Sequence, residues 1–220
     1  GIYLELDHVT YNVSNREQSI LKDVSLQINP NSRILIQGDS GSGKSSLLRI
    51  ISGIISPSTG KVYVNGFSIE GLNINHYRSH LGLSLSEEFP FEGTLRENLT
   101  FGDTSITDDN ILELLKNIGL LNFLKELPKG LNTILYPEGK QMSYTIGKKI
   151  VLARAILKKP KLLILEDALD QFSEQNTKSI IDFLSKPSNP WALIVVSSNS
   201  YWKTYCKEIV ALKNGEIHLK

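Results

Sequence analysis

Residues 38–45 read Gly-Asp-Ser-Gly-Ser-Gly-Lys-Ser, a complete phosphate-binding loop pattern. Glycines in this pattern let backbone N–H groups curl around phosphate oxygens, because no Cβ stands in the way. The Lys44 side chain would place a cation on the β- and γ-phosphates, and the Ser45 hydroxyl is suited to ligate Mg²⁺. We predict that this segment binds a nucleoside triphosphate through Gly38, Ser40, Gly41, Ser42, Gly43, Lys44, Ser45 and Ser46.

The residues on either side of the loop give it the required context. Residues 33–37 (RILIQ) are typical of a short buried strand, and residues 46–52 (SLLRIIS) of a helix with one apolar face. A strand, a glycine-rich loop and a helix in this order place phosphate at the helix N-terminus. The alternative is a glycine-rich turn before a helix that binds nothing.

Composition limits the classes of partner and compartment. The 220 residues carry 24 basic and 23 acidic side chains, a net charge of +1, which gives no electrostatic reason to expect a nucleic-acid partner. The single cysteine, Cys206, excludes an internal disulfide and fits a reducing compartment. No apolar run approaches the roughly 20 residues that span a bilayer. The only methionine is Met142, so the sequence starts without an initiator; we expect the chain to be excised from a longer protein, and the alternative is a processed N-terminus.

Hydrophobic periodicity predicts an alternation of strands and helices along the rest of the chain. Several of the strands are apolar throughout, which favours a mostly parallel α/β core. Hairpins are predicted at Asn65-Gly66 and Asn214-Gly215. The remaining predicted strands cover residues 2–13, 24–28, 81–85, 162–165 and 192–196, and the remaining predicted helices cover residues 108–118, 120–127, 145–157 and 174–185.

Residues 86–150 differ in character from the rest, since helical patterns replace strands there. We predict one domain over residues 1–220, with residues 1–85 and 151–220 forming the core and residues 86–150 an inserted helical subdomain. Pro128, Gly130, Pro137 and Gly139 predict a long loop inside this insertion.

The whole chain resembles the nucleotide-binding domain of ABC transporters. LLRIISG and KVYVNG follow the loop as they do in that family, and VLARAILKKPKLLILE at residues 151–166 aligns without a gap. Residues 91–102 (FEGTLRENLTFG) and 127–139 (LPKGLNTILYPEG) resemble the exporter branch most closely. The resemblance implies a RecA-like P-loop fold with a mostly parallel core sheet, an N-terminal antiparallel β subdomain and an inserted α-helical subdomain.

In that family two such domains dimerise head to tail, and each ATP lies between one domain's phosphate loop and the signature motif of the other. The resemblance therefore implies ATP and Mg²⁺ as ligands and a second nucleotide-binding domain as partner, in a homodimer or a heterodimer. It also implies membrane domains, which we expect to be fused upstream, and a location on the cytoplasmic side of a membrane.

At several positions where the family has a functional residue, this sequence has a different residue. Tyr11 stands where an aromatic stacks on adenine; the alternative is a tyrosine packed at a sheet edge. Ser86 replaces a Gln that contacts Mg²⁺ and the attacking water, and it is too short to do so directly. Glu87 or Glu88 could substitute, or the segment could be a simple polar loop.

The signature, usually LSGGQ, reads Met142-Ser143-Tyr144-Thr145-Ile146, so Tyr144 and Thr145 place side chains where two glycines approach the partner's γ-phosphate. An Asp-Glu pair usually ends the strand at 162–165, and here the pair is Glu166-Asp167. We expect Glu166 to orient Mg²⁺ and Asp167 to be a short base, since a displacement of about 1 Å can cost on the order of 10²-fold in rate. Ser198 stands in place of the histidine that contacts the γ-phosphate.

Two functions remain open at this point. The first is an ABC-type ATPase, the engine of an exporter. The second is a regulatory module that binds MgATP and hydrolyses it slowly or not at all, because the alterations affect most steps after binding. We predict an exporter domain with binding retained and hydrolysis strongly reduced. A soluble ABC protein without a transport role fits less well, because of the segments that resemble exporters.

Overall fold

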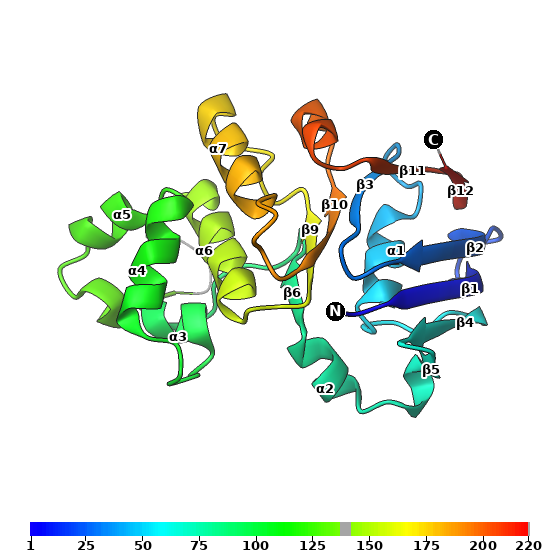
Figure 1. Cartoon of the computed structure of the whole chain (residues 1–220), viewed down its shortest axis with the longest axis horizontal. Helices are drawn as coiled ribbons and strands as arrows, with labels where there is room; N and C mark the ends of the chain where they lie inside the picture. The colour runs from blue at the N-terminus through cyan, green and yellow to red at the C-terminus, as the bar shows by residue number, and fades with distance from the viewer. Residues whose placement is uncertain (137–141, 220) are drawn as a thin grey trace.

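A computed structural model describes residues 1–136 and 142–219. Two main sheets and a group of helices make up the molecule (Figure 1). The larger sheet has six strands in the order β12-β11-β3-β10-β9-β6. Its strands are β3 (Arg33–Gln37), β6 (Leu81–Ser84), β9 (Leu162–Glu166), β10 (Ala192–Val196), β11 (Glu208–Lys213) and β12 (Glu216–Leu219).

All neighbouring strands of this sheet are parallel except β12, which pairs with β11 as an antiparallel hairpin. The carboxyl ends of β3, β9 and β10 therefore meet at one edge, where ligands bind in open α/β sheets. The second sheet is antiparallel, in the order β2-β1-β4-β5. Its strands are β1 (Leu4–Tyr11), β2 (Leu21–Ile28), β4 (Thr59–Val64) and β5 (Phe67–Ser68).

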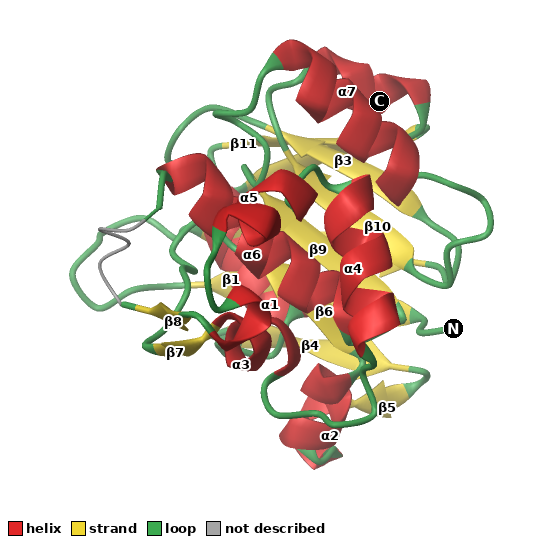
Figure 2. Ribbon diagram, turned by 90° about the vertical axis from the view of Figure 1, so that its left-hand side faces the viewer, coloured by secondary structure: helices red, strands yellow, loops and turns green. Residues whose placement is uncertain are grey.

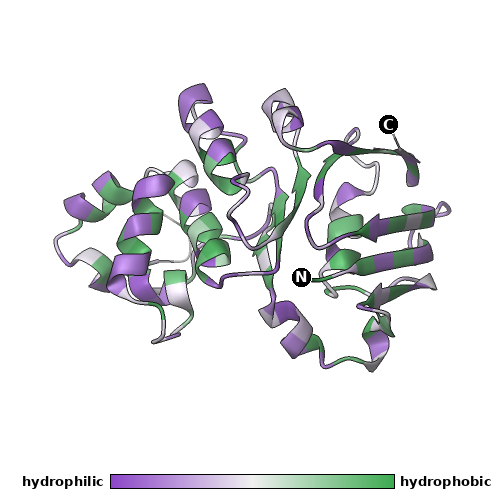
Figure 3. Ribbon diagram, viewed as in Figure 1, coloured by the Kyte–Doolittle hydropathy of each residue, from purple (hydrophilic) through white to green (hydrophobic). Residues whose placement is uncertain are grey.

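The parallel strands divide the hydrophobic core in two by simple alternation. On β3, Leu35 packs with the helices of one face, whereas Ile34 and Ile36 pack with α1 (Lys44–Ile51) and the antiparallel sheet on the other. β9 and β10 alternate in the same way, since successive side chains of a strand point to opposite faces. Apolar residues gather accordingly on these strands and on the inner sides of the helices (Figure 3).

The face opposite α1 is covered by helices (Figure 2). Residues Asp108–Asn117 form α4, Tyr144–Leu157 form α6 and Glu174–Leu184 form α7. Figure 1 shows α3 (Leu95–Thr100), α4, α5 (Leu121–Glu126) and α6 at one end of the molecule, away from the antiparallel sheet. α6 crosses residue 150, where we placed a subdomain boundary, and the division into subdomains stays a prediction.

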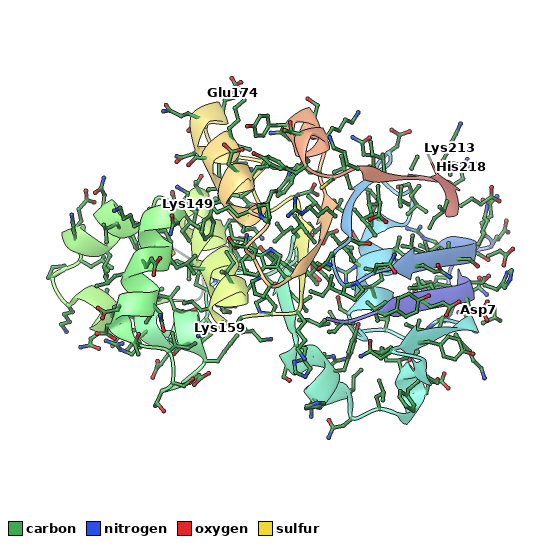
Figure 4. All side chains as sticks on the ribbon, in the orientation of Figure 1. Asp7, Lys149, Lys159, Glu174, Lys213 and His218 are labelled. Carbon is green, nitrogen blue, oxygen red and sulfur yellow. The ribbon has the colours of Figure 1, made fainter. Side chains whose placement is uncertain are left out.

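The predicted α/β fold with an antiparallel β subdomain is confirmed. β3 and β10 have the predicted bounds, and the predicted hairpin at Asn214-Gly215 joins β11 to β12. The sequence reading missed α2 (Ile74–Ser79) and α3, which are too short for a clear periodicity, and the short β7 (Gly93–Thr94) and β8 (Ile134–Leu135) ribbon. β8 and a 3-10 turn at Gly130–Asn132 occupy part of the predicted long loop, whose Pro137 and Gly139 lie outside the described residues. Charged side chains such as Asp7 and Glu174 lie on the outside (Figure 4).

Within residues 1–136 and 142–219, no helix combines the length and the apolar character that crossing a membrane requires.

Candidate nucleotide-binding site

The loop at residues 38–45 connects β3 to α1, as predicted, and its glycines are sterically required. Gly41 and Gly43 have positive φ values of 79° and 103°, which residues with a Cβ rarely adopt. Gly38 lies so close to the β11 backbone that an added Cβ would stand 2.3 Å from the Leu212 carbonyl oxygen. The backbone of the loop is therefore closely confined by the neighbouring strand.

Replacing Gly38 with alanine is expected to lower the free energy of unfolding by about 1–3 kcal/mol, because the added methyl group overlaps backbone that cannot move aside cheaply. Urea denaturation measures this loss. Gly71→Ala is the matched control, since an added Cβ there meets nothing within 4 Å. Equal stability of the two variants within about 0.5 kcal/mol would contradict the close packing at Gly38.

An open cavity of about 620 Å³ lies over this loop at the carboxyl edge of the sheet. The loop forms its floor, and residues that follow β9 and β10 form its wall. Ser42 belongs to the loop but is buried, and it does not line the cavity. The predicted site residues that do line it are Gly38, Ser40, Gly41, Gly43, Lys44, Ser45, Ser46, Glu166, Asp167 and Ser198.

The Lys44 side chain folds back over the loop. Its ammonium group donates to the carbonyl oxygens of Gly38, at 2.5 Å, and Asp39, at 2.8 Å. The cation therefore stands at the mouth of the loop, beside the first turn of α1, whose free N–H groups favour an anion.

Glu166 ends β9 and is 4% exposed. One carboxylate oxygen accepts a hydrogen bond from the Ser45 hydroxyl. The other accepts from the Ser86 N–H, at 3.1 Å, and from the Ser86 hydroxyl, at 3.0 Å. A carboxylate and the loop serine thus meet at the phosphate side of the cavity, where oxygen ligands would suit a hard cation such as Mg²⁺.

Asp167 begins the turn after β9 and has a left-handed backbone, with φ of 50°. Its N–H donates to the Val196 carbonyl at 3.0 Å, which ties this turn to β10. Burial, together with the charges of Asp170 and Glu166, raises the pKa of Asp167 to about 6. At pH 7 the carboxylate is still mostly ionised and able to accept a proton.

The structure places the two acids that follow Ser86 away from the cavity. Glu87 forms an ion pair with Arg49 at 2.6 Å. The Glu88 carboxylate accepts from the Leu85 N–H at 3.0 Å, within its own turn. Neither lines the cavity. Among the residues that the structure describes, the acidic residues that line it are Asp39, in the loop itself, and Glu166 and Asp167, at the end of β9.

Tyr11 and Ser198 take different positions relative to the cavity. Tyr11 ends β1, is half-buried and packs against the core beneath the antiparallel sheet. It does not line the cavity, whereas Arg16 and Ile20, which follow it, do. Ser198 is exposed on the wall formed after β10. Arg16 and Ile20 belong to no recognisable sequence motif. They reach the loop only because the chain between β1 and β2 passes over it.

The predicted signature residues lie at the start of α6, outside this cavity. Ser143 caps the helix, and its hydroxyl accepts from the Ile146 N–H at 3.3 Å. Tyr144 is 43% exposed and stacks edge-on against Phe89, with ring centroids 5.7 Å apart. Thr145 is half-buried. The signature and the phosphate loop of one chain thus form separate surfaces.

The residues present fit a nucleoside triphosphate with Mg²⁺. The cavity has the size of ordinary small-molecule sites, about 300–1,000 Å³. Its floor combines a glycine-lined backbone, the Lys44 cation and a helix N-terminus, all suited to phosphate. The Ser45 hydroxyl and the Glu166 carboxylate supply adjacent oxygens for a cation. Fold and site together define a P-loop nucleotide-binding domain.

The comparisons with known proteins give the family. The family described as "ABC transporter" matches residues 21–170, and the chain belongs to it. The resemblance seen in the sequence is thereby confirmed, and the chain is homologous to the nucleotide-binding domains of ABC exporters.

Two relatives illustrate this homology. The human "ATP-binding cassette sub-family B member 5" is 30% identical over 96% of this chain, which spans 17% of that protein. A "putative multidrug export ATP-binding/permease protein" of Staphylococcus aureus is 29% identical over 97% of this chain, which spans 37% of that protein. The chain is thus equivalent to only a part of these relatives.

A solved structure described as a bacterial Atm1-family ABC exporter with ATP bound shares the fold. Its TM-score is 0.88 at 21% identity, over 98% of this chain and 37% of the exporter chain. At this identity the match shows the fold alone.

Proposed function

We propose that this chain is the ATP-binding domain of an ABC exporter, and that it retains MgATP binding but hydrolyses MgATP slowly. The observation that carries the proposal is the cavity at residues 38–45, where Lys44, Ser45 and Glu166 face the space in which phosphates would lie. Homology to exporter domains supports the transport role.

The proposed binding uses groups that are already arranged. Backbone N–H groups of the loop and the Lys44 ammonium bind phosphate oxygens, and the Ser45 and Glu166 oxygens hold the metal. Mg²⁺, when bound, would neutralise phosphate charge. Tyr11 does not line the cavity and is not among these arranged groups; it is proposed to stack on an adenine that extends beyond the cavity, a contact of about 1–3 kcal/mol.

Slow hydrolysis is supported by what faces the γ-phosphate end of the cavity. The base proposed there, Asp167, has a side chain one methylene shorter than glutamate. Ser198 offers a short neutral hydroxyl. Ser86 already uses its N–H and hydroxyl on Glu166, and Glu87 and Glu88 are engaged elsewhere. Only short side chains are therefore left to position the attacking water. Positioning of the reactants is a major part of rate enhancement in phosphoryl transfer, so hydrolysis is expected to be slow.

Closure onto a second domain is proposed to be altered as well. Tyr144 and Thr145 project at the helix start that would approach the partner's phosphate. The exposed Tyr144 ring already leans on Phe89. Membrane domains, a second nucleotide-binding domain and a position on the cytoplasmic side of a membrane belong to the same proposal, and a homodimer and a heterodimer both remain compatible with it. Nothing favours a soluble ABC protein over this arrangement.

One experiment tests the proposal: the affinity for MgATP and single-turnover hydrolysis, measured on the same purified chain. We expect a Kd between about 1 μM and 1 mM and a rate at least about 100-fold below the usual enzyme median of ~10 s⁻¹. A rate within about tenfold of that median would contradict slow hydrolysis and leave an ordinary exporter engine. Absence of binding would contradict the proposal as a whole.

A further inference from the structure

Lys148, in the second turn of α6, is a buried cation. Among the described residues its ammonium group makes no ion pair within 4 Å, and Glu88, Glu87 and Glu166 act on it only from farther away. Lys148 is 1% exposed. Its ammonium donates to three backbone carbonyl oxygens, those of Ser86 at 2.6 Å, Glu88 at 2.9 Å and Leu85 at 3.3 Å. These carbonyls use all three N–H donors of the ammonium group.

Two aromatic rings complete the surroundings of this ammonium. The Phe89 ring centroid lies 4.3 Å from Nζ and the Tyr144 centroid lies 5.6 Å away. A buried charge is costly unless hydrogen bonds and other favourable contacts replace its water. The arrangement therefore holds the turn at residues 85–89 in one place against the start of α6.

The same turn reaches the nucleotide cavity through one further residue. Ser86, whose carbonyl accepts from Lys148, directs its N–H and hydroxyl to Glu166. Glu166 in turn accepts from the Ser45 hydroxyl of the phosphate-binding loop. A continuous series of polar contacts thus runs from the signature end of α6 to the loop.

We propose that Lys148 is a positioning residue that holds the turn at residues 85–89 so that Ser86 fixes Glu166 beside Ser45. The start of α6 and the metal side of the cavity are thereby coupled. A change at the signature end, such as closure of a second domain on Tyr144, would reach Glu166 through this turn. The proposal deepens the proposed function and rests on it for the identity of the ligand.

Lys149 provides a matched control for Lys148. Lys149 follows Lys148 on α6 and is labelled in Figure 4. It is also buried, at 5% exposure. Its ammonium lies 3.4 Å from the Gly119 carbonyl oxygen and 5.2 Å from the Phe172 ring centroid. No contact of Lys149 with the turn at residues 85–89 is found in the part of the chain that the structure describes, so its replacement removes a buried cation without releasing that turn.

The test compares Lys148→Met with Lys149→Met by hydrogen exchange and by MgATP binding. Without nucleotide, we expect the backbone amides of residues 85–89 to exchange at least about tenfold faster in Lys148→Met and at the wild-type rate in Lys149→Met. The Kd for MgATP is expected to rise at least about fivefold in Lys148→Met only. Unchanged exchange at residues 85–89 in a folded Lys148→Met would overturn the proposal.

A double-mutant cycle separates positioning from general stability. If Lys148 acts through Ser86, the double variant Lys148→Met with Ser86→Ala binds MgATP no more weakly than the weaker single variant, within about twofold. If instead the Kd of the double variant rises by the product of the two factors measured for the single variants, the two residues act independently and the coupling is overturned. If Lys148→Met fails to fold, Lys148→Gln, which retains two donors, takes its place with the same expectations at about half the effect on a logarithmic scale.

The two proposals can fail separately. A wild-type chain that binds no MgATP would contradict the proposed function, while the exchange comparison on nucleotide-free protein still decides whether Lys148 holds the turn.

Discussion

Lys44→Ala is expected to weaken MgATP binding by about 100-fold or more, whereas the fold remains intact. The Lys44 side chain lines the cavity, and a hydrogen bond to a charged group contributes about 1.5–3 kcal/mol. About 2.7 kcal/mol corresponds to 100-fold in Kd. Isothermal titration or a fluorescent nucleotide measures the loss.

Lys125→Ala is the control for this prediction, because Lys125 is an exposed lysine on α5. It should bind MgATP as the wild type does, since a single exposed charge at a distance is screened by salt. Equal affinities in Lys44→Ala and Lys125→Ala would show that nucleotide binds elsewhere or that the cation contributes nothing.

Restoring the usual residues is expected to raise single-turnover hydrolysis by about 100-fold or more. Asp167→Glu with Ser198→His lengthens the base and supplies a γ-phosphate contact in this chain's own cavity. Tyr144→Gly with Thr145→Gly clears the helix start that approaches a partner's phosphate. Because a misplacement of about 1 Å costs on the order of 10²-fold, the combined variant should recover at least that factor.

The two pairs of substitutions act at different places, one in this chain's own cavity and one at the contact with a second copy. The dependence of each effect on protein concentration therefore serves as the control. The pair at 167 and 198 should raise the rate at every protein concentration. The pair at 144 and 145 should help only where two copies associate, so its effect should grow with concentration. A combined variant that remains as slow as the wild type, although it binds MgATP equally well, would contradict the assignment of slow hydrolysis to these positions.

Much of the site was predictable because its chemistry lies in consecutive residues. The loop at 38–45 has a fixed spacing, and the strand before it and the helix after it form as predicted. Asn65-Gly66 and Asn214-Gly215 likewise determine their hairpins, since both residue pairs adopt the positive φ that such turns need. Short helices such as α2 escaped prediction, because six residues carry little periodicity.

The contacts made by the residues that follow β6 could not be predicted from their residue types. Glu87 and Glu88 were candidates to replace a glutamine near the metal, yet one pairs with Arg49 and the other with the Leu85 N–H. Lys148 carried no signal either, because lysine side chains are normally exposed and nothing in its residue type distinguishes it from the neighbouring Lys149. Each outcome depends on which backbone the folded chain brings alongside.

The sequence by itself determined the family, the α/β fold and the phosphate-binding loop, because these depend on local spacing and on the period of apolar residues. Only the tertiary structure decided that Ser86 meets Glu166, that Lys148 is buried under the turn at residues 85–89, and that Arg16 reaches the cavity. These contacts join residues distant in the chain, and the paths of β6, β9 and α6 through the core bring them within hydrogen-bonding distance.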